Sequence, residues 1–242
     1  MTVTAIIGGT GAALFPGRSA AEEVPVTTRW GECSAPVERW AQGDDTVLFL
    51  PRHGRDASIA PHRVNYRANI QALADLGATR IIALNAVGGI TSAAGSLVVP
   101  EQLIDYTWGR EHTYYDGSDG SLEHVEITEP YDSNLRKSLV SAAALAGEPV
   151  EAGGVYGVTQ GPRLETAAEV DRLERDGCTL IGMTSMPEAG LAAELGVAYA
   201  CLALVVNAAA GRGSAGIHAD IEAHVNNTIT AAAAVIDAFL QE

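Results

Sequence analysis

The chain has 242 residues, and with 15 Lys and Arg against 30 Asp and Glu its formal net charge is −15. This acidity argues against nucleic acid or an anionic membrane as the main partner, so an anionic substrate would need a local basic pocket. The N-terminus lacks the basic start of a signal peptide, and no apolar run is as long as a membrane span. We therefore expect a soluble, cytoplasmic protein.

The cysteines and histidines give no sign of a disulfide framework or a metal site. Cys33, Cys178 and Cys201 are odd in number and lack CxxC spacing, which favours free thiols in a reducing compartment. Four histidines lack metal-ligand spacing with one another or with the cysteines: His112, His124, His218 and His224. No GxSxG motif supports nucleophilic covalent catalysis.

Strand-like apolar runs alternate with helix-like stretches along the chain, with no linker between two halves. β-Branched and apolar residues predict strands over residues 3–7, 46–50, 80–84, 179–181 and 200–206. Apolar residues at helical spacing predict helices over residues 65–76, 166–175, 187–195 and 221–240. The pattern predicts a single α/β domain over residues 1–242.

Each predicted strand runs into glycine or a polar residue. In open α/β sheets, ligands bind outside the carboxyl ends of the strands, so we expect these segments to form one pocket. The segments are residues 8–11 (Gly-Gly-Thr-Gly), 52–54 (Arg-His-Gly), 85–89 (Asn-Ala-Val-Gly-Gly), 182–184 (Gly-Met-Thr) and Asn207.

The first three strand ends have the chemistry of a phosphate site. Residues 8–11 supply flexible backbone and the Thr10 hydroxyl, although an ordinary tight turn explains them equally well. Arg52 offers the planar fork that matches phosphate oxygens, next to His53; the alternative is a surface arginine beside a structural histidine. Residues 85–89 present an Asn and exposed backbone amides, or else form a plain exit from the strand.

The later segments add an anion site and groups that can bind a planar ring. Residues 182–188 (Gly-Met-Thr-Ser-Met-Pro-Glu) join a strand end to a helix start, where free N–H groups suit an anion. Glu165 can accept two hydrogen bonds from a ring bearing N–H groups, or it is a solvated carboxylate. Asn207 follows an apolar run and can donate and accept without burying a charge, or it caps a turn.

These motifs resemble, in order and over nearly the whole chain, the trimeric purine nucleoside phosphorylases and their methylthioadenosine phosphorylase relatives. The motifs are Gly-Thr-Gly (residues 9–11), Arg-His-Gly (52–54), Val-Asn-Tyr-Arg-Ala-Asn-Ile (64–70), Gly-Pro-Arg-Leu-Glu-Thr (161–166) and Gly-Met-Thr-Ser-Met-Pro-Glu (182–188). The resemblance implies a central mixed β-sheet flanked by helices, the nucleoside phosphorylase-I fold. It also implies a pentosyltransferase that uses phosphate as co-substrate and needs no cofactor.

The resemblance assigns roles to single residues. The implied phosphate site comprises Thr10, Arg52, His53, Asn85, Ala86 and Thr184, with His53 and Asn207 as catalytic residues. The implied nucleoside site comprises His124, Leu164, Glu165, Met183, Asn207, Ala209 and His224. Met183 would pack under the ribose, and Glu165 and Asn207 would read the base. In a homotrimer, His124 would reach the active site of the neighbouring subunit.

One departure from the methylthioadenosine enzymes predicts the base. Those enzymes carry an Asp-x-Asp pair where this chain has residues 207–209 (Asn-Ala-Ala), and a small residue in place of Glu165. A 6-oxopurine offers N1–H to a carboxylate and O6 to an amide donor, whereas adenine reverses this polarity. Buried groups left unpaired cost roughly 1–3 kcal/mol each. We therefore expect hypoxanthine or guanine nucleosides, in purine and methylthio-nucleoside salvage.

The 5′ group of the sugar is less determined by the sequence. Overall likeness favours methylthioinosine, and inosine or guanosine is the alternative if His224 meets a 5′-hydroxyl; a helix-surface histidine is equally compatible. The expected reaction is phosphorolysis, in which phosphate attacks the anomeric carbon. A hydrolase using water and a non-catalytic nucleoside-binding protein stay open, although Arg52 and Thr184 speak against the hydrolase.

Overall fold

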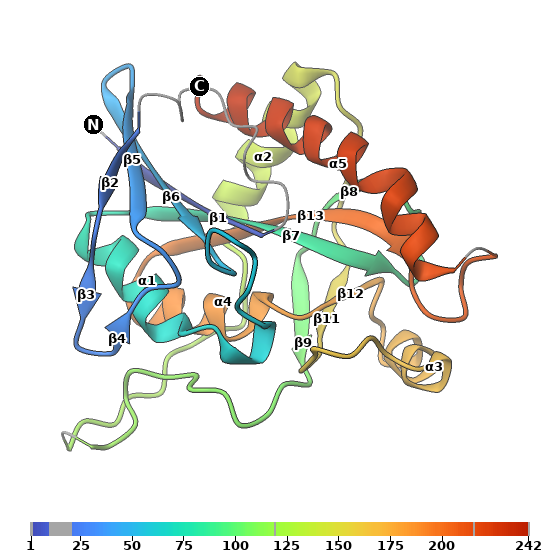
Figure 1. Ribbon diagram of the computed structural model, residues 1–242, viewed down its shortest axis with the longest axis horizontal. Coiled ribbons are helices and arrows are strands. Elements are labelled where there is room, and N and C mark those ends of the chain that lie inside the picture. The colour runs from blue at the N-terminus through green and yellow to red at the C-terminus, as the bar shows by residue number, and fades with distance from the viewer. Residues whose placement is uncertain (1, 10–20, 119, 215, 242) are drawn as a thin grey trace.

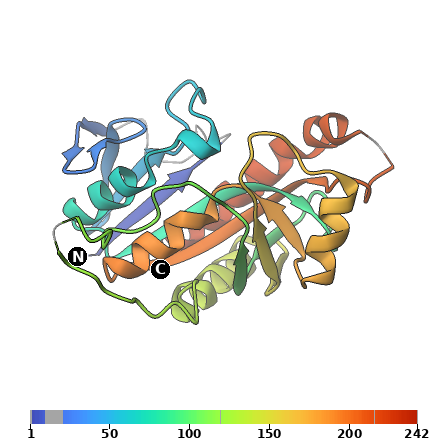
Figure 2. The same ribbon diagram turned by 90° about the horizontal axis from the view of Figure 1, so that it is seen from below.

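The computed structural model describes residues 2–9, 21–118, 120–214 and 216–241. Within them, a mixed sheet of 11 strands carries helices on both faces, which confirms the expected α/β architecture (Figure 1, Figure 2). No helix in these ranges is long and apolar enough to cross a membrane. Thr10, expected at the phosphate site, lies outside the described residues.

The main part of the sheet has the strand order β10-β8-β13-β7-β1-β6-β5-β2. In chain order these strands are β1 (Val3–Gly8), β2 (Glu22–Val24), β5 (Val37–Gln42), β6 (Asp45–Pro51), β7 (Arg80–Gly89), β8 (Leu97–Val99), β10 (Val150–Ala152) and β13 (Ala198–Ala208). A branch joins the end of β7 and consists of β9 (Gln102–Asp105), β11 (Val155–Val158) and β12 (Leu180–Gly182). Two short strands pair separately, β3 (Thr27–Thr28) and β4 (Gly31–Glu32).

The central strands β6, β1, β7 and β13 run parallel to one another and are buried over most of their length. Alternate residues point to opposite faces, so Ile7 packs in one core and Ile6 in the other. The core that contains Ile7 is covered by α1 (Tyr66–Asp75) and α4 (Ser185–Glu194). The core that contains Ile6 is covered by α2 (Ser133–Ala146) and α5 (Ile217–Phe239) (Figure 1).

The predicted helices are present, and their capping residues explain where they begin. The Asn65 side chain accepts a hydrogen bond from a backbone N–H of the first turn of α1 (3.2 Å), and Thr166 starts a capping box. Helix α2 was not predicted, although Asp132 caps its start and Gly147 ends it at φ 72°. The remaining helices are α3 (Ala167–Arg175) and the short 3₁₀ helix η3 (Pro61–Arg63).

β7 and β13 are four or five residues longer than predicted, and both differences move site residues. β7 does not end at residue 84, because residues 85–89 continue the strand rather than forming an exit loop. β13 extends to Ala208, so Asn207 lies inside a strand rather than after one. The two strands pair along their length except for a β-bulge between Val205 and Asn207. Pairing between neighbours thus extends both strands past the apolar runs that predicted them.

Candidate active site

The sheet opens beside the middle of β7. β1 pairs with β7 only as far as Leu84, and β12 pairs with the same strand from Gly88 onward. Between these two pairings Ala86 is exposed, although the residues on either side of it are buried. The opening lies on a cavity of about 260 Å³. The main chain of β7 therefore meets the cavity here, where a backbone N–H can bind a ligand instead of a strand.

Most of the predicted site residues line this one cavity, although they come from separate elements. They are Arg52, His53, Ala86, Leu164, Glu165, Met183, Thr184, Asn207 and Ala209. Asn85 is only 1% exposed and bonds to Arg52 rather than facing the cavity. His124 does not line it either: this histidine is exposed in the segment between β9 and α2.

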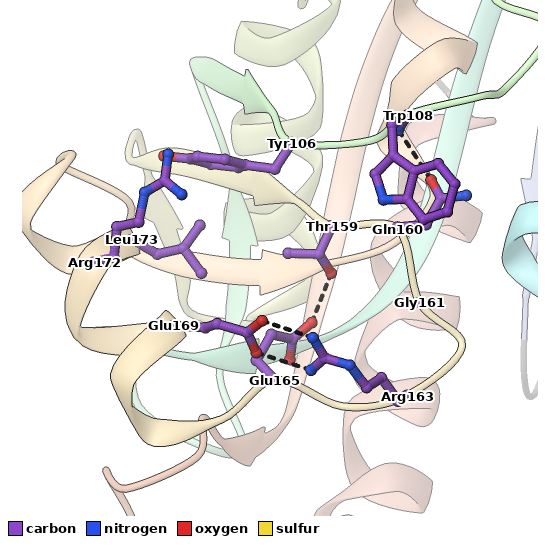
Figure 3. A pocket seen from close by; sticks show the side chains of 10 residues that line it. All are labelled: Tyr106, Trp108, Thr159, Gln160, Gly161, Arg163, Glu165, Glu169, Arg172 and Leu173. Atoms are coloured by element: carbon purple, nitrogen blue, oxygen red, sulfur yellow. Dashed lines mark hydrogen bonds and ion pairs between the residues drawn. The ribbon is translucent and has the colours of Figure 1, made fainter.

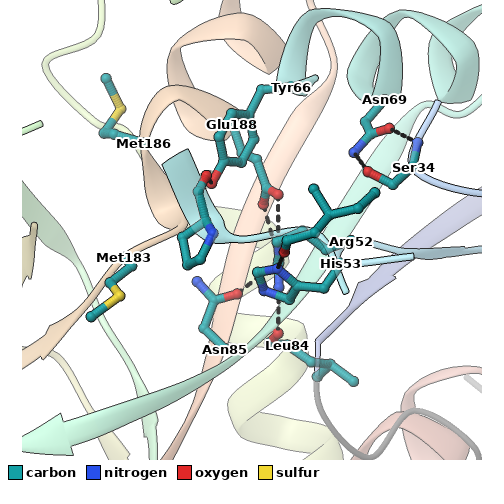
Figure 4. A network of polar contacts seen from close by, with 12 residues as sticks. Ser34, Arg52, His53, Tyr66, Asn69, Leu84, Asn85, Met183, Met186 and Glu188 are labelled. Carbon is teal, nitrogen blue, oxygen red and sulfur yellow. Dashed lines mark hydrogen bonds and ion pairs between the residues drawn. The ribbon is translucent and has the colours of Figure 1, made fainter. Parts of the chain in front are cut away.

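Arg52 directly follows β6, and its guanidinium is held by several partners (Figure 4). Nε donates to Glu188 Oε1 (2.6 Å) and Nη2 donates to Glu188 Oε2 (3.0 Å). Nη2 also donates to Asn85 Oδ1 (2.8 Å), and Nη1 donates to the Leu84 carbonyl (3.0 Å). A second N–H of Nη1 remains, and a Cβ on Gly9 would lie 3.5 Å from that nitrogen. Arg52 can thus direct one hydrogen bond to an anion from a fixed position.

Glu188 neutralises Arg52, and the sequence did not single it out as a site residue. Its side chain is fully buried in α4 and also accepts a hydrogen bond from the Tyr199 hydroxyl (2.9 Å). Burial opposes the charge on Arg52, but the carboxylate outweighs burial and raises the pKa of Arg52 above its ordinary value. The available signal was a carboxylate among the apolar and small residues that open α4, because such a charge is buried only when paired.

His53 lies next to Arg52 with one ring nitrogen already bonded. Nδ1 lies 2.8 Å from the Ile59 carbonyl, and because a carbonyl oxygen only accepts, we assign the ring proton to Nδ1. Burial, and then the charge of Arg52, lower the pKa of His53 below its ordinary value. The neutral ring is therefore favoured, with Nε2 able to accept a hydrogen bond from a protonated phosphate oxygen.

Glu165 and Asn207 bring complementary hydrogen-bonding groups to the cavity. Glu165 Oε1 accepts the Thr159 hydroxyl (2.6 Å), which leaves Oε2 as an acceptor for a ligand. Asn207 Nδ2 donates to the Ala208 carbonyl (2.7 Å), which leaves a second amide N–H and Oδ1. Gly88 gives this amide room, because a Cβ there would lie 3.3 Å from Nδ2. Such a pair suits a ring that carries both N–H and C=O groups.

Helix α5 gives the cavity an apolar wall. Ile217, Ile221 and Val225 recur at helical spacing and line the cavity. His224 does not: its Nδ1 bonds a carbonyl of its own helix (2.8 Å). Its ring packs on Gly95, where a Cβ would lie 3.0 Å from Cδ2. The wall therefore suits an apolar substituent better than a hydroxyl.

A larger cavity of about 450 Å³ shares Glu165 with the first (Figure 3). Its lining includes Tyr106, Trp108, Gln160 and Arg172. Arg52 and the other residues with phosphate-binding chemistry lie in the smaller cavity instead. We therefore assign the candidate active site to the smaller cavity.

The cysteines are free thiols, as expected from their number and spacing. Burial, and then the charge of Asp75, raise the pKa of Cys33 to about 11, which disfavours a reactive thiolate. Among the residues that the structure describes, no cluster of His, Cys, Asp or Glu side chains could hold a metal ion.

Comparison with known proteins identifies the family. Residues 4–241 match the phosphorylase superfamily. A probable S-methyl-5′-thioinosine phosphorylase from Xanthomonas campestris is 50% identical over 213 residues, covering 87% of this chain and 85% of the relative. The 6-oxopurine nucleoside phosphorylase of Pyrococcus furiosus is 46% identical over 214 residues, covering 86% and 80%. Methylthioadenosine phosphorylase from Schistosoma mansoni, solved with adenine, gives a TM-score of 0.91 at 30% identity, covering 100% of this chain and 91% of that one.

The chain belongs to the phosphorylase superfamily. Its relatives and structural neighbours are nucleoside phosphorylases, and the chain is accordingly an enzyme of the pentosyltransferase type. The resemblance seen in the sequence motifs, and the fold that it implied, are confirmed.

Proposed function

We propose that the enzyme catalyses the phosphorolysis of 6-oxopurine nucleosides and prefers S-methyl-5′-thioinosine, which it converts with phosphate to hypoxanthine and 5-methylthioribose 1-phosphate. The observation that carries this proposal is that one cavity combines the Glu165 carboxylate and the Asn207 amide with the anion-binding groups around Arg52. The names of the relatives from Xanthomonas campestris and Pyrococcus furiosus support the same substrate class.

Phosphate binds at the opening of the sheet in this proposal. Arg52, the Ala86 main chain and the Thr184 hydroxyl donate to it, and His53 Nε2 accepts a hydrogen bond from its remaining P–OH group. Because Glu188 cancels the charge of Arg52, directed hydrogen bonds rather than net positive charge hold the anion. The full proposed phosphate-binding set is Thr10, Arg52, His53, Ala86 and Thr184, and Asn85 acts through its hydrogen bond to the Arg52 guanidinium.

The reaction transfers the sugar from the purine to phosphate. A phosphate oxygen bonds to the anomeric carbon while the bond from that carbon to N9 breaks, and its electron pair leaves with the purine. The bound phosphate stabilises the cation-like sugar, which packs on Met183, and the Asn207 N–H stabilises negative charge at N7. Positioning and preorganised dipoles account for such catalysis, with no metal or organic cofactor.

The apolar wall of α5 supports a methylthio group at the 5′ position. Ile221 and Val225 offer contacts to sulfur and methyl but no hydrogen bond, while His224 packs elsewhere. Inosine and guanosine remain the second candidate substrates, because Glu165 and Asn207 would read the same edge of their bases. We expect inosine and guanosine to bind more weakly than methylthioinosine, because their 5′-hydroxyl would face this apolar wall.

We further propose that residues 1–242 act as one domain in a cytoplasmic homotrimer that serves purine salvage. The exposed apolar side chains Leu122 and Ile127 flank His124 in the segment between β9 and α2, which supports burial of this segment against another subunit. His124 would then complete the neighbouring active site. A monomeric mass in solution with full activity would rule out this assembly.

The proposal predicts a strong preference for 6-oxopurines that depends on Glu165. The kcat/KM for methylthioadenosine should be at least about 30-fold below that for methylthioinosine, because two unpaired groups cost about 2 kcal/mol or more. Glu165→Gln, which can also donate, should narrow this gap. Glu151→Gln, on the exposed strand β10 and outside the cavity lining, is the matched control and should keep the gap between the two substrates. Equal release of adenine and hypoxanthine by the wild-type enzyme would contradict the proposal.

A further inference from the structure

Arg110 is a second nearly buried arginine, and it lies outside the lining of both cavities. It is 8% exposed and stands in the irregular segment that follows β9. Its guanidinium carbon lies 5.4 Å from the centre of the Tyr66 ring, and Nη1 is 3.3 Å from the Tyr66 hydroxyl. Its other hydrogen bonds go to oxygen atoms in two segments that carry proposed site residues.

The first segment joins β12 to α4 and carries Met183 and Thr184. Nη1 donates to the carbonyls of Met183 (2.8 Å) and Met186 (2.6 Å). The Met183 carbonyl precedes α4, and Pro187, four residues on, has no N–H to donate to it. Met186 also departs from helical geometry, at φ −114° and ψ 136°. Arg110 therefore supplies hydrogen-bond donors that the kinked start of α4 cannot supply. These two hydrogen bonds fix the backbone beside the proposed sugar and phosphate sites.

The second segment follows β11 and leads to Glu165. Nη2 donates to the carbonyls of Gln160 (2.9 Å) and Thr159 (3.2 Å), and Nε donates to Gln160 Oε1 (3.2 Å). The Thr159 hydroxyl in turn donates to Glu165 Oε1 (2.6 Å) (Figure 3). A single planar group thus bonds the backbone on the base side of the cavity and the backbone on its sugar and phosphate side.

We infer that Arg110 is a positioning residue. It sets the distance between the base-reading Glu165 and the segment that carries Met183 and Thr184. This inference rests on the proposed function, because it needs a substrate that spans both segments. A guanidinium holds five donors in one plane, whereas lysine has three donors on a flexible stem. A misplacement of about 1 Å between reacting groups lowers rates by about 100-fold.

Substitution of Arg110 tests the inference, with rates measured on the nucleoside that the wild-type enzyme cleaves fastest. Arg110→Ala should lower kcat/KM by about 100-fold for the nucleoside and also raise the KM for phosphate, because both segments lose their donors. Guanidinium chloride at non-denaturing concentration should restore part of the rate saturably, whereas equal NaCl should not. The kcat/KM of Arg110→Lys should lie between the values for Arg110→Ala and the wild type. If Arg110→Ala fails to fold, Arg110→Lys takes its place in the test.

Arg136→Ala is the matched control. Arg136 is also largely buried, but it lies on α2 and does not line the cavity. Its loss should therefore leave the KM values for nucleoside and phosphate unchanged. Folded Arg110 variants with wild-type kcat/KM would overturn the inference. So would a slow Arg110→Ala enzyme that guanidinium does not help, since that pattern indicates a general structural role. The choice of substrate by the wild-type enzyme decides the proposed function separately.

Discussion

Among single residues, Arg52 and Glu188 set the electrostatics of the proposed phosphate site. Both side chains are buried, at 1% and 0% exposure, so neither charge would be tolerated alone. Their pairing leaves a neutral unit that still directs an N–H toward the cavity. The two residues are 136 positions apart, and no local sequence pattern connects them. This explains why Arg52 could be predicted from its place after a strand while its pairing with Glu188 could not.

Glu188→Gln should be strongly destabilising, because it removes one charge of a buried pair and sets an amide against a guanidinium donor. Losing one partner of such a pair costs about 3–5 kcal/mol, which urea unfolding would measure as a fall in the free energy of unfolding. The control is Glu22→Gln in the exposed ion pair with Arg39, where less than about 1 kcal/mol should be lost. Similar small losses for both variants would argue against the buried pair as a stabilising unit.

The lowered pKa of His53 predicts a pH dependence of stability. As the pH falls from neutral through about 6.5, the unfolded chain takes up a proton on this histidine before the folded protein does. This group therefore destabilises the folded state progressively on acidification. His53→Asn should lose less free energy of unfolding between pH 7 and pH 5.5 than the wild type loses. Parallel losses in both proteins would show that His53 contributes nothing to this slope.

At the scale of elements, the site depends on irregularities of β7 and β13. The apolar runs of both strands were visible in the sequence, since strands buried on both faces read as continuous apolar stretches. The opening of the sheet at Ala86 was not visible in the sequence, because it arises where β1 ends and β12 begins along one edge of β7. The bulge beside Asn207 was likewise hidden, because it is a feature of pairing between strands.

The α5 wall leads to a prediction about substrate choice. Val225→Thr keeps the shape of the side chain but adds a hydroxyl to the apolar wall, so the ratio of kcat/KM for methylthioinosine to that for inosine should fall by about tenfold. The comparison is Val140→Thr on α2, which does not line the cavity and should leave the ratio unchanged. An unaltered ratio in Val225→Thr would show that the α5 wall does not determine the preference for the 5′ group.

For the whole molecule, the sequence predicted the α/β class, the main parallel strands and four of the helices within a few residues of their observed bounds. Most of the site residues that it named line one cavity. Arg110 was missed because its role depends on contacts 49 to 76 positions away, in segments that no periodicity joins to it. Local patterns therefore identified groups that line the cavity, while the residues that hold them in place required the tertiary structure.

The central claim is that the sugar is transferred from a 6-oxopurine to phosphate. The most direct measurement follows hypoxanthine release from methylthioinosine as phosphate is varied, with the sugar product observed by phosphorus NMR. The account predicts saturable dependence on phosphate, no release without it, and one sugar phosphate formed for each hypoxanthine. Release of hypoxanthine without phosphate, with free methylthioribose as the product, would contradict it.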